Sequence, residues 1–316
     1  MDESQIRKIG LDMIETHISW VLFSDEFVYK IKKPVSFSFL DFSTLEKRKF
    51  FCEEEVKLNR RLAPDVYIGV VPIDNELEIE GKQEPVGYAV KMKKLDNSMK
   101  MDRLLLEGKV NEEDVKKIAA VVAGFHEKIE VIREGYYTPE IVEKQITDLK
   151  NFREIVEEAC GLGNHVDIVL QRSEKFIREN HELIRKRIAD GMVRNCHGDL
   201  HSANIFIDGD PIIIDCIEFS RDFRYVDVAS EIAFMAMDLD YHGRKDLADA
   251  FVDEYVKKTG DRELLKLLNL YKCYRANVRA KIAAIDYSQH PGEEPKNRIE
   301  KYMNLAESYS GYLSGL

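Results

Sequence analysis

The most informative segment of the sequence is CHGDLHSANIFIDGDPIIIDC, residues 196–216. Two apolar runs flank an Asp-Gly turn in it, a pattern that predicts a β-hairpin. Asp199 and Asn204 precede the first run, and Asp215 follows the second. Because a hairpin brings the outer ends of its strands together, we expect these three oxygen-bearing side chains to converge.

Converging carboxylate and amide oxygens suit Mg²⁺, which completes its octahedron with water and phosphate oxygens. The sequence therefore predicts a site for nucleotide phosphates, with Asn204 and Asp215 as the metal ligands. A nearby carboxylate can orient an attacking hydroxyl and accept its proton, and Asp199 is the candidate. The interval from Asp199 to Asn204 equals that in the kinase catalytic-loop pattern H-R-D-x-x-x-x-N, with Gly198 in place of the arginine.

The pattern H-G-D-x-x-x-x-N, followed by Ile-Asp at 214–215, resembles the aminoglycoside phosphotransferase and choline kinase group of the protein-kinase-like fold. More narrowly, residues 16–34 and 216–219 are similar to uncharacterised aminoglycoside-phosphotransferase-like proteins that are often fused to a C-terminal P-loop kinase domain. No G-x-x-x-x-G-K-[ST] occurs in residues 1–316, so we expect the stand-alone form. The resemblance implies ATP as the donor, Mg²⁺, and a hydroxyl of a small molecule as the acceptor. It also implies that Asp227, in a D-x-A segment, braces the catalytic loop.

The first ninety-five residues are rich in strand patterns, in the order β-β-α-β-β. The strands are expected at 19–23, 27–32, 66–71 and 86–92, and a helix at about 43–62.

The resemblance implies a strand lysine that holds the nucleotide phosphates and a helix glutamate that holds the lysine. Lys30 and Glu55 fit these roles, with Lys32 and Glu54 as the second candidates.

The resembling fold covers the phosphates with a loop near the start of the sheet, which here falls at residues 16–19 and contains no glycine. Thr16, His17 and Ser19 are the expected nucleotide contacts in that loop. The last strand of the small lobe and its hinge fall at residues 90–95, which adds Lys94 to the nucleotide site.

After residue 95 long helical patterns dominate, interrupted by strand signals only near residues 196–218. The predicted fold class is therefore α+β, in the two-lobed, protein-kinase-like form. We expect a β-rich, nucleotide-binding small lobe at residues 1–94. The large lobe at residues 95–316 would be mostly helical and would carry the catalytic loop, the Mg²⁺ site and the acceptor-binding helices.

The composition limits the partners. The chain has 47 Lys and Arg against 58 Asp and Glu, a net charge of −11, which argues against nucleic acid and anionic membranes as general partners. The five cysteines are widely spaced and form no C-x-x-C pair, so we expect free thiols. The N-terminus lacks the basic and apolar regions of a signal peptide, and no apolar run approaches the length of a membrane span. We expect a cytoplasmic protein.

Several alternatives stay open at this stage. A protein kinase-like enzyme or a catalytically idle nucleotide-binding module is the alternative to a small-molecule kinase, although no A-P-E motif follows Asp215. The sequence does not identify the acceptor or the oligomeric state, and it does not decide between ATP and GTP.

His197 is expected to brace the loop, whereas His201 either contacts the transferred phosphate or has a structural role. Helical spacing places three cations on one face, either as an anion-binding wall or as an ion-paired face: Lys272, Arg275 and Arg279.

Overall fold

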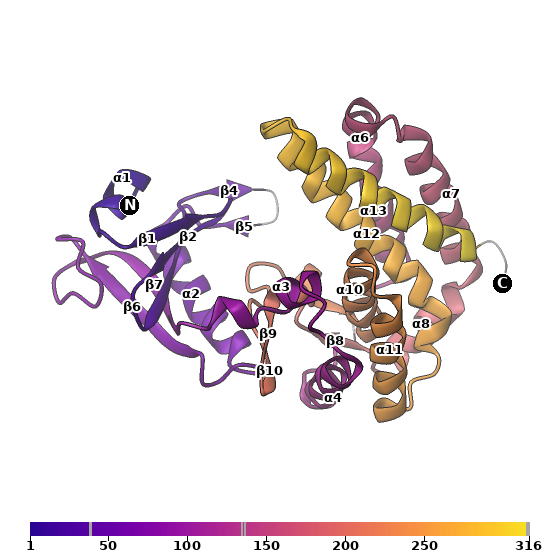
Figure 1. Cartoon of the computed structure of the whole chain (residues 1–316), viewed down its shortest axis with the longest axis horizontal. Coiled ribbons are helices and arrows are strands. Elements are labelled where there is room, and N and C mark those ends of the chain that lie inside the picture. Colours follow the sequence, from indigo (N-terminus) through magenta and orange to yellow (C-terminus); the bar gives the residue numbers. More distant parts are fainter. Residues whose placement is uncertain (38–39, 134, 136, 314–316) are drawn as a thin grey trace. The chain divides into compact units, whose positions relative to one another are not determined.

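The computed structural model describes residues 1–37, 40–133, 135 and 137–313 (Figure 1). Its backbone contacts divide the chain into two units. The first unit comprises Met1–Leu104 and Ala203–Phe223. The second comprises Leu105–Ser202 and Arg224–Leu316. The first unit is built on a sheet and the second is mostly helical, which confirms the predicted fold class.

The first unit contains a five-stranded antiparallel sheet in the order β1-β2-β3-β7-β6. Its strands are β1 (Asp12–Glu15), β2 (Ser19–Phe23), β3 (Phe27–Lys32), β6 (Tyr67–Asp74) and β7 (Pro85–Lys93). Helix α2 (Leu45–Asn59) packs against β6 and β7. Alternating side chains fill two cores. One contains Ile6, Trp20, Leu22, Tyr29, Ile31, Ile73 and Ala89, and the other, shared with α2, contains Cys52, Val56, Ala63, Val66, Tyr67, Val90 and Met92.

The expected hairpin of residues 19–32 is confirmed as β2 and β3, which pair from Ser19↔Lys32 to Phe23↔Val28. The expected helix is confirmed as α2, capped by the Thr44 side chain. The sequence patterns missed four short elements: α1 (Glu3–Lys8), β1, β4 (Ser36–Phe37) and β5 (Leu40–Asp41). They span two to six residues, and β1 is largely exposed, so neither length nor alternation of apolar residues marks them.

The hairpin predicted from residues 196–216 is also confirmed. Strands β9 (Ile205–Asp208) and β10 (Asp210–Ile213) pair antiparallel, and Gly209 turns between them with φ +74°. The 3₁₀ turn η3 (Ser202–Asn204) leads into β9. Two further short elements, η1 (Asn97–Met99) and α3 (Met101–Leu106), follow the five-stranded sheet, and η1 contacts β9.

The second unit is dominated by helices, as expected from the periodicity after residue 95. They are α4 (Glu112–Lys128), α5 (Pro139–Thr147), η2 (Asp148–Phe152), α6 (Arg153–Cys160), α7 (Gly163–Glu179), α8 (His181–Ala189), α10 (Val228–Tyr241), α11 (Lys245–Thr259), α12 (Leu264–Gln289) and α13 (Glu293–Tyr312). A two-stranded sheet joins β8 (Val193–Asn195) to β11 (Tyr225–Asp227), and the short α9 (Arg221–Arg224) precedes β11.

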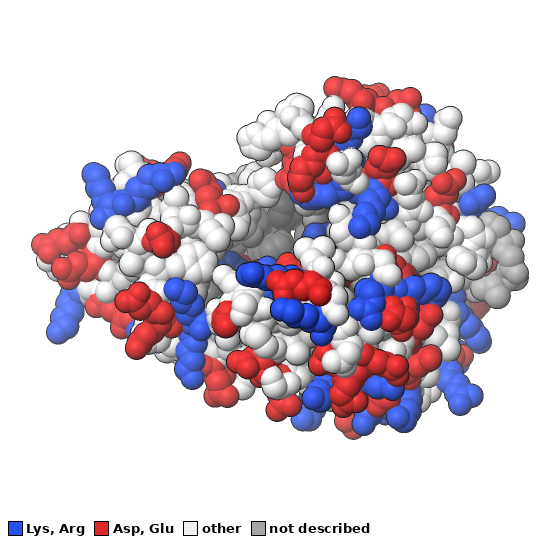
Figure 2. All heavy atoms as spheres, viewed as in Figure 1, with Lys and Arg blue, Asp and Glu red and all other residues white. Residues whose placement is uncertain are grey.

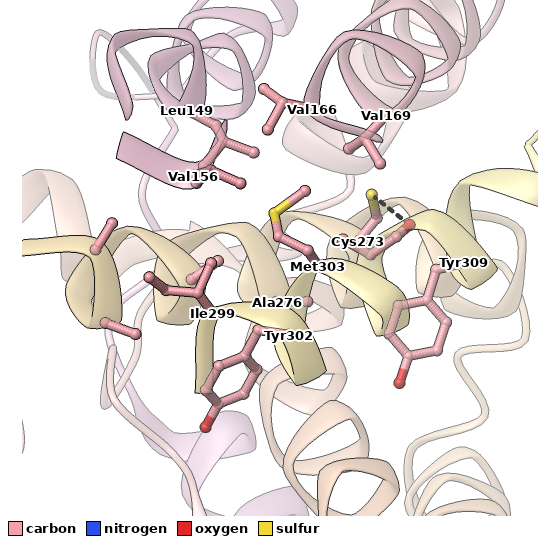
Figure 3. Packing of buried hydrophobic residues seen from close by; sticks show 14 of the residues in the cluster. Leu149, Val156, Val166, Val169, Cys273, Ala276, Ile299, Tyr302, Met303 and Tyr309 are labelled. Carbon is pink, nitrogen blue, oxygen red and sulfur yellow. Dashed lines mark hydrogen bonds between the residues drawn. The ribbon is translucent and has the colours of Figure 1, made fainter. Parts of the chain in front are cut away.

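The core of the second unit lies where α12 and α13 meet α6 and α7 (Figure 3). Small residues such as Cys273 and Ala276 on α12 allow α13 to pack closely, and Met303 and Val166 fill the space around them. Helix α10 is buried over nearly its whole length. Within the described residues, no helix has the length and apolarity that a membrane span requires.

The charges are dispersed on the face drawn in Figure 2. Lysine and arginine side chains are interspersed there with aspartate and glutamate. The net charge of −11 is therefore not collected into one acidic patch on this face.

Candidate active site

The first unit holds a cluster of charges around Lys30 on β3. Its Nζ lies 3.0 Å from Glu55 Oε1 on α2 and 2.5 Å from Asp215 Oδ1, two residues beyond the end of β10. Burial alone would lower the pKa of Lys30, but Asp215 and Glu55 raise it well above its usual value. The structure thus brings together three of the predicted residues, and Lys30 stays a cation.

Lys32 serves a different purpose from Lys30. It is 1% exposed, and its Nζ lies 2.7 Å from Glu55 Oε2 and also pairs with Glu218. Glu55 therefore bridges two lysines with one oxygen for each. Burial would raise the pKa of Glu55, yet Lys30 and Lys32 hold it at about 2. Of the two candidate lysines, Lys30 has the more exposed side chain, at 15%. The side chain of Lys32 is fully buried, and its ion pair with Glu55 holds that carboxylate in place.

The alternative helix residue, Glu54, pairs with Lys57 on the surface. Sequence reasoning also missed Glu218, whose carboxylate is buried beside Lys32 and whose pKa burial raises. Its only signal was its position three residues after Asp215.

Asn204 and Asp215 both lie at the open end of the β9–β10 hairpin. Asn204 directly precedes β9, and Asp215 lies two residues beyond the end of β10. The N–H of Ile214 donates to the backbone oxygen of Asn204 at 2.9 Å, so the hairpin closes next to both residues. The side chain of Asp215 is 45% exposed, and its Oδ2 has no hydrogen-bond partner among the described residues. A half-exposed carboxylate oxygen fits the ligand preference of Mg²⁺, and the backbone of Asn204 lies at the same end of the hairpin.

The backbone of Asp215 is held in the left-handed region, with φ +67°. Its N–H donates to the hydroxyl of Tyr67 at 3.1 Å, and the next N–H, of Cys216, donates to Asn59 Oδ1 at 2.8 Å. A non-glycine residue with positive φ is uncommon and clusters at functional sites. Strand β6 and helix α2 therefore hold Asp215 in a conformation that its own backbone preference opposes.

The expected phosphate loop is the tight turn between β1 and β2. Thr16 Oγ1 accepts from the N–H of Ser19 at 2.9 Å and so fixes the turn. Thr16 and His17 are exposed, whereas the Ser19 side chain is buried and points away from the surface. Lys94 lies at the opposite end of the strands, where its Nζ donates to the backbone oxygen of Ser24 at 2.9 Å. The structure does not bring Lys94 together with the turn.

The loop that the sequence predicts to be catalytic, residues 196–202, belongs to the second unit. His197 Nδ1 accepts from the N–H of Asp199 at 3.2 Å, which agrees with the expected bracing role of His197. His201 Nε2 lies 3.3 Å from Asp199 Oδ2. Burial alone would raise the pKa of Asp199, but His201, Arg279 and His197 lower it. Asp199 is therefore ionised at neutral pH and can accept a hydrogen bond.

The carboxylate that holds this loop is Glu231 on α10, and the expectation for Asp227 was wrong. Glu231 accepts from the N–H of His197 at 3.0 Å and from the N–H of Gly198 at 2.6 Å. Asp227 instead accepts from Arg187 and from the N–H of Ala229, where it caps α10. Glu231 lies four residues, or one helical turn, after Asp227. This turn of α10 is the one that contacts the loop.

A buried chain of hydrogen bonds supports Glu231. His126 Nε2 lies 2.9 Å from Glu231 Oε1, and His126 Nδ1 lies 2.7 Å from the hydroxyl of Tyr255. Three helices, α4, α10 and α11, thus converge on the loop. Gly198 has φ +90°, a conformation that the arginine of the kinase pattern would adopt only with strain.

Glu231→Gln is expected to lower the free energy of unfolding by about 2–3 kcal/mol at pH 7, because a buried amide cannot replace a carboxylate toward two N–H donors and His126. Burial would raise the pKa of Glu231, but His126 and the loop N–H groups lower it to about 2 from its usual value near 4.5. The carboxylate's contribution is therefore complete above pH 4.5 and falls as the pH drops toward 2.

Urea unfolding of wild type and variant at pH 7 and pH 3 measures this, with the half-exposed Glu263→Gln as the control. The difference in free energy of unfolding between wild type and Glu231→Gln should be smaller at pH 3 than at pH 7. A difference below 0.5 kcal/mol at pH 7, roughly the range of ordinary surface substitutions, would show that Glu231 does not stabilise the loop.

The three cations on one face of α12 have different environments in the structure. Lys272 is buried and paired with Asp240, as expected for an ion-paired face. Arg275 is buried and donates through Nη1 to the backbone oxygen of Gly198 at 3.2 Å, so it supports the catalytic loop. Arg279 is partly exposed and donates through Nε to the hydroxyl of Tyr302 at 3.3 Å.

Comparison with solved structures finds the same fold in other proteins. A Plasmodium vivax ethanolamine kinase matches 97% of this chain and 83% of its own, with 13% identity and a TM-score of 0.52. A thermostable mutant of aminoglycoside phosphotransferase APH(4)-Ia, in a ternary complex with AMP-PNP and hygromycin B, matches 95% of this chain and 96% of its own, with 11% identity and a TM-score of 0.55. At these identities the likeness establishes the fold.

Sequence comparison gives the family. Uncharacterised proteins of Mycobacterium tuberculosis and Mycobacterium bovis are 32% identical over 299 residues, which cover 92% of this chain. The chain spans 58% of the length of these relatives. The sequence model described as "Phosphotransferase enzyme family" matches residues 107–268, about half of the chain. The chain therefore belongs to the phosphotransferase enzyme family.

Proposed function

We propose that this chain is an ATP-dependent kinase that transfers the γ-phosphoryl group to a hydroxyl of a small molecule. Residues 1–94 form the nucleotide-binding lobe in this proposal, and residues 95–316 form the lobe that binds the acceptor. The observation that carries the proposal is the contact of Lys30 with both Glu55 and Asp215. A strand lysine held by a helix carboxylate, next to the carboxylate that ends a hairpin, is the arrangement that phosphoryl transfer in the kinase-like fold requires.

The nucleotide would bind to the first unit. The Lys30 ammonium is fixed by Glu55 and is suited to pair with the oxygens of the α and β phosphates. The exposed turn with Thr16 and His17, and the backbone of Ser19, would cover the phosphates, and Lys94 would lie at the hinge near the adenine. The ternary complex of the aminoglycoside phosphotransferase with AMP-PNP supports an adenine nucleotide as the donor.

Asn204 and Asp215 would hold Mg²⁺. The exposed Asp215 Oδ2 and the amide of Asn204 offer the hard oxygens that this ion prefers. The ion, when bound, neutralises charge that develops on the phosphate oxygens. The ion pair with Lys30 orients Asp215 for that purpose.

Asp199 would be the base. Its ionised carboxylate accepts a hydrogen bond from the acceptor hydroxyl and orients the oxygen toward the γ-phosphorus. As the new oxygen–phosphorus bond forms, the bond between the γ-phosphorus and the bridging oxygen of ADP breaks, and the hydroxyl proton moves to Asp199. His197, Glu231 and Arg275 hold the loop backbone, so the carboxylate keeps its position during the transfer.

The test is ATP consumption by the purified chain with Mg²⁺ against sugars, polyols, amino alcohols, nucleosides and aminoglycosides, each repeated with Asp199→Asn. Turnover that depends on an acceptor and is lost in the variant supports the proposal. ATP binding without turnover on any acceptor would contradict it, and would favour a protein substrate or an idle nucleotide-binding module.

Lys30→Met is expected to lower kcat/KM for ATP by about 100-fold or more, because the phosphates lose a preorganised cation. Lys91→Met is the control, since Lys91 has the same 15% side-chain exposure and pairs with a carboxylate of the same unit, that of Glu80, whereas Lys30 pairs with two. The control should stay near wild type. Equal effects of the two substitutions would show that Lys30 contributes stability and not phosphate binding.

A further inference from the structure

One face of α12 borders the catalytic loop and carries two arginines a single helical turn apart. Arg275 donates to the backbone oxygens of Gly198, at 3.2 Å, and of Ser230, at 3.3 Å. Its guanidinium lies 4.7 Å from the ring centre of Phe234, and the ring of His201 lies 5.3 Å from the same centre. Arg275 is therefore fixed directly beside the peptide that precedes Asp199.

Arg279 lies one turn further along the same face and is less constrained. Its Nε donates to the hydroxyl of Tyr302 at 3.3 Å, and its guanidinium lies 5.7 Å from the Tyr302 ring centre. Tyr302 is itself fixed by stacking on Tyr241, with ring centres 4.3 Å apart and planes 18° apart. Tyr302 and Tyr241 thus form an aromatic wall that sets the direction of the guanidinium.

The two terminal nitrogens of Arg279 are available. Among the described residues they have no hydrogen-bond partner and no carboxylate within ion-pair distance, and the residue is partly exposed. The guanidinium also lies near the proposed catalytic carboxylate, because Arg279 is one helical turn from Arg275, which donates to the backbone oxygen of Gly198 directly before Asp199. A rigid, charged fork with free donors therefore lies beside the proposed base.

A guanidinium with two free nitrogens binds carboxylates and phosphates through two parallel hydrogen bonds, and it repels ammonium groups. We propose that the phosphoryl acceptor carries an anionic group, a carboxylate or a phosphate ester, beside its reactive hydroxyl, and that Arg279 binds this group. The inference rests on the proposed function, because it takes Asp199 as the base. It assigns the acceptor class that the sequence left open and separates it from polycationic aminoglycosides.

The same donors could meet anionic oxygens from a second source, the transferred phosphoryl group of ATP. The two sources can be distinguished by which kinetic constant changes when Arg279 is substituted. If Arg279 binds the acceptor, its loss raises KM for the acceptor and leaves KM for ATP unchanged. If it binds the transferred group, its loss lowers kcat equally for charged and neutral acceptors.

The experiment measures kcat/KM with ATP and Mg²⁺ on acceptors matched except for charge. The sets are glycerol, glycerate and glycerol 3-phosphate; glucose, gluconate and glucose 6-phosphate; ethanolamine and serine; and hygromycin B as a polycation. Wild type is compared with Arg279→Gln, Arg279→Lys and the control Arg172→Gln. Arg172 is a suitable control because it is also partly buried and also has a hydroxyl, that of Ser310, as its partner.

We expect the anionic member of at least one set to exceed its neutral counterpart, and Arg279→Gln to lower its kcat/KM roughly 10- to 100-fold through KM. Arg279→Lys should restore part of the loss, and Arg172→Gln should match wild type. Equal or better transfer to neutral or cationic members would overturn the inference while leaving the proposed function in place, provided that Asp199→Asn abolishes the transfer.

Calorimetric binding of glycerate and glycerol 3-phosphate to the chain with Mg²⁺ and AMP-PNP gives a readout that does not need turnover. Anion binding that Arg279→Gln removes, without transfer to any compound, would show Arg279 to be an anion site but would overturn both the acceptor class and the proposed function. The inference fails if no anion is transferred and none binds more weakly to Arg279→Gln than to wild type.

Discussion

Asp199→Asn is expected to lower kcat by about 10²- to 10⁴-fold, the range that a positioned general base contributes, with little change in nucleotide affinity. The amide has nearly the shape of the carboxylate but cannot accept the hydroxyl proton. The loop should keep its position, because His197 Nδ1 and Glu231 bind backbone N–H groups that the substitution does not touch. Acceptor-dependent ATP consumption and a titration with AMP-PNP measure the two effects.

Asp210→Asn provides the control for Asp199→Asn. Asp210 is an exposed carboxylate at the start of β10, and its substitution should leave both kcat and affinity near wild type. A parallel loss of nucleotide binding and turnover in Asp199→Asn would instead indicate a structural role. That outcome would remove Asp199 as the base.

Arg187→Met should produce the largest loss of stability, about 3–5 kcal/mol in the free energy of unfolding. Arg187 is 1% exposed and forms two-pronged pairs with both Asp227 and Asp261, at 2.7–2.8 Å. Burial would lower the pKa of Arg187, but Asp227 and Asp261 raise it, so the guanidinium stays charged. Its removal leaves two carboxylates without their cation, one of which is almost fully buried.

Urea unfolding measures this loss, and Arg185→Met on the same helix is the matched control because Arg185 pairs only at the surface. We expect the control to change stability by less than about 1 kcal/mol. The triple variant Arg187→Met, Asp227→Asn, Asp261→Asn should lose less than the sum of its parts, because the three groups interact directly. Additive losses, or a loss below 1 kcal/mol for Arg187→Met, would exclude this ion cluster as a major source of stability.

Features within reach of local patterns were predictable from the sequence. The hairpin follows from two apolar runs around an Asp-Gly turn, and its closure brings Asn204 and Asp215 together. Lys30 and Glu55 lie on elements with clear periodicity, and the structure places them 3.0 Å apart. In each case a strand or helix of five or more residues, or a standard turn, fixes the side chain.

The features that sequence reasoning missed depend on partners far apart in the chain. Glu231 meets His126, which is 105 residues away, and Arg187 meets Asp261, which is 74 residues away. A buried polar residue looks like an ordinary surface residue when only its neighbours in sequence are considered. Asp227 was assigned to the loop because of its motif, whereas tertiary packing gives that contact to Glu231, one turn later.

The left-handed backbone of Asp215 has a consequence for robustness. At φ +67° glycine would be more comfortable than aspartate, so a change to glycine would relieve local strain. It would also remove the carboxylate that Lys30 holds. The left-handed backbone of Asp215 is therefore a cost in robustness, and the ion pair with Lys30 works in the opposite direction.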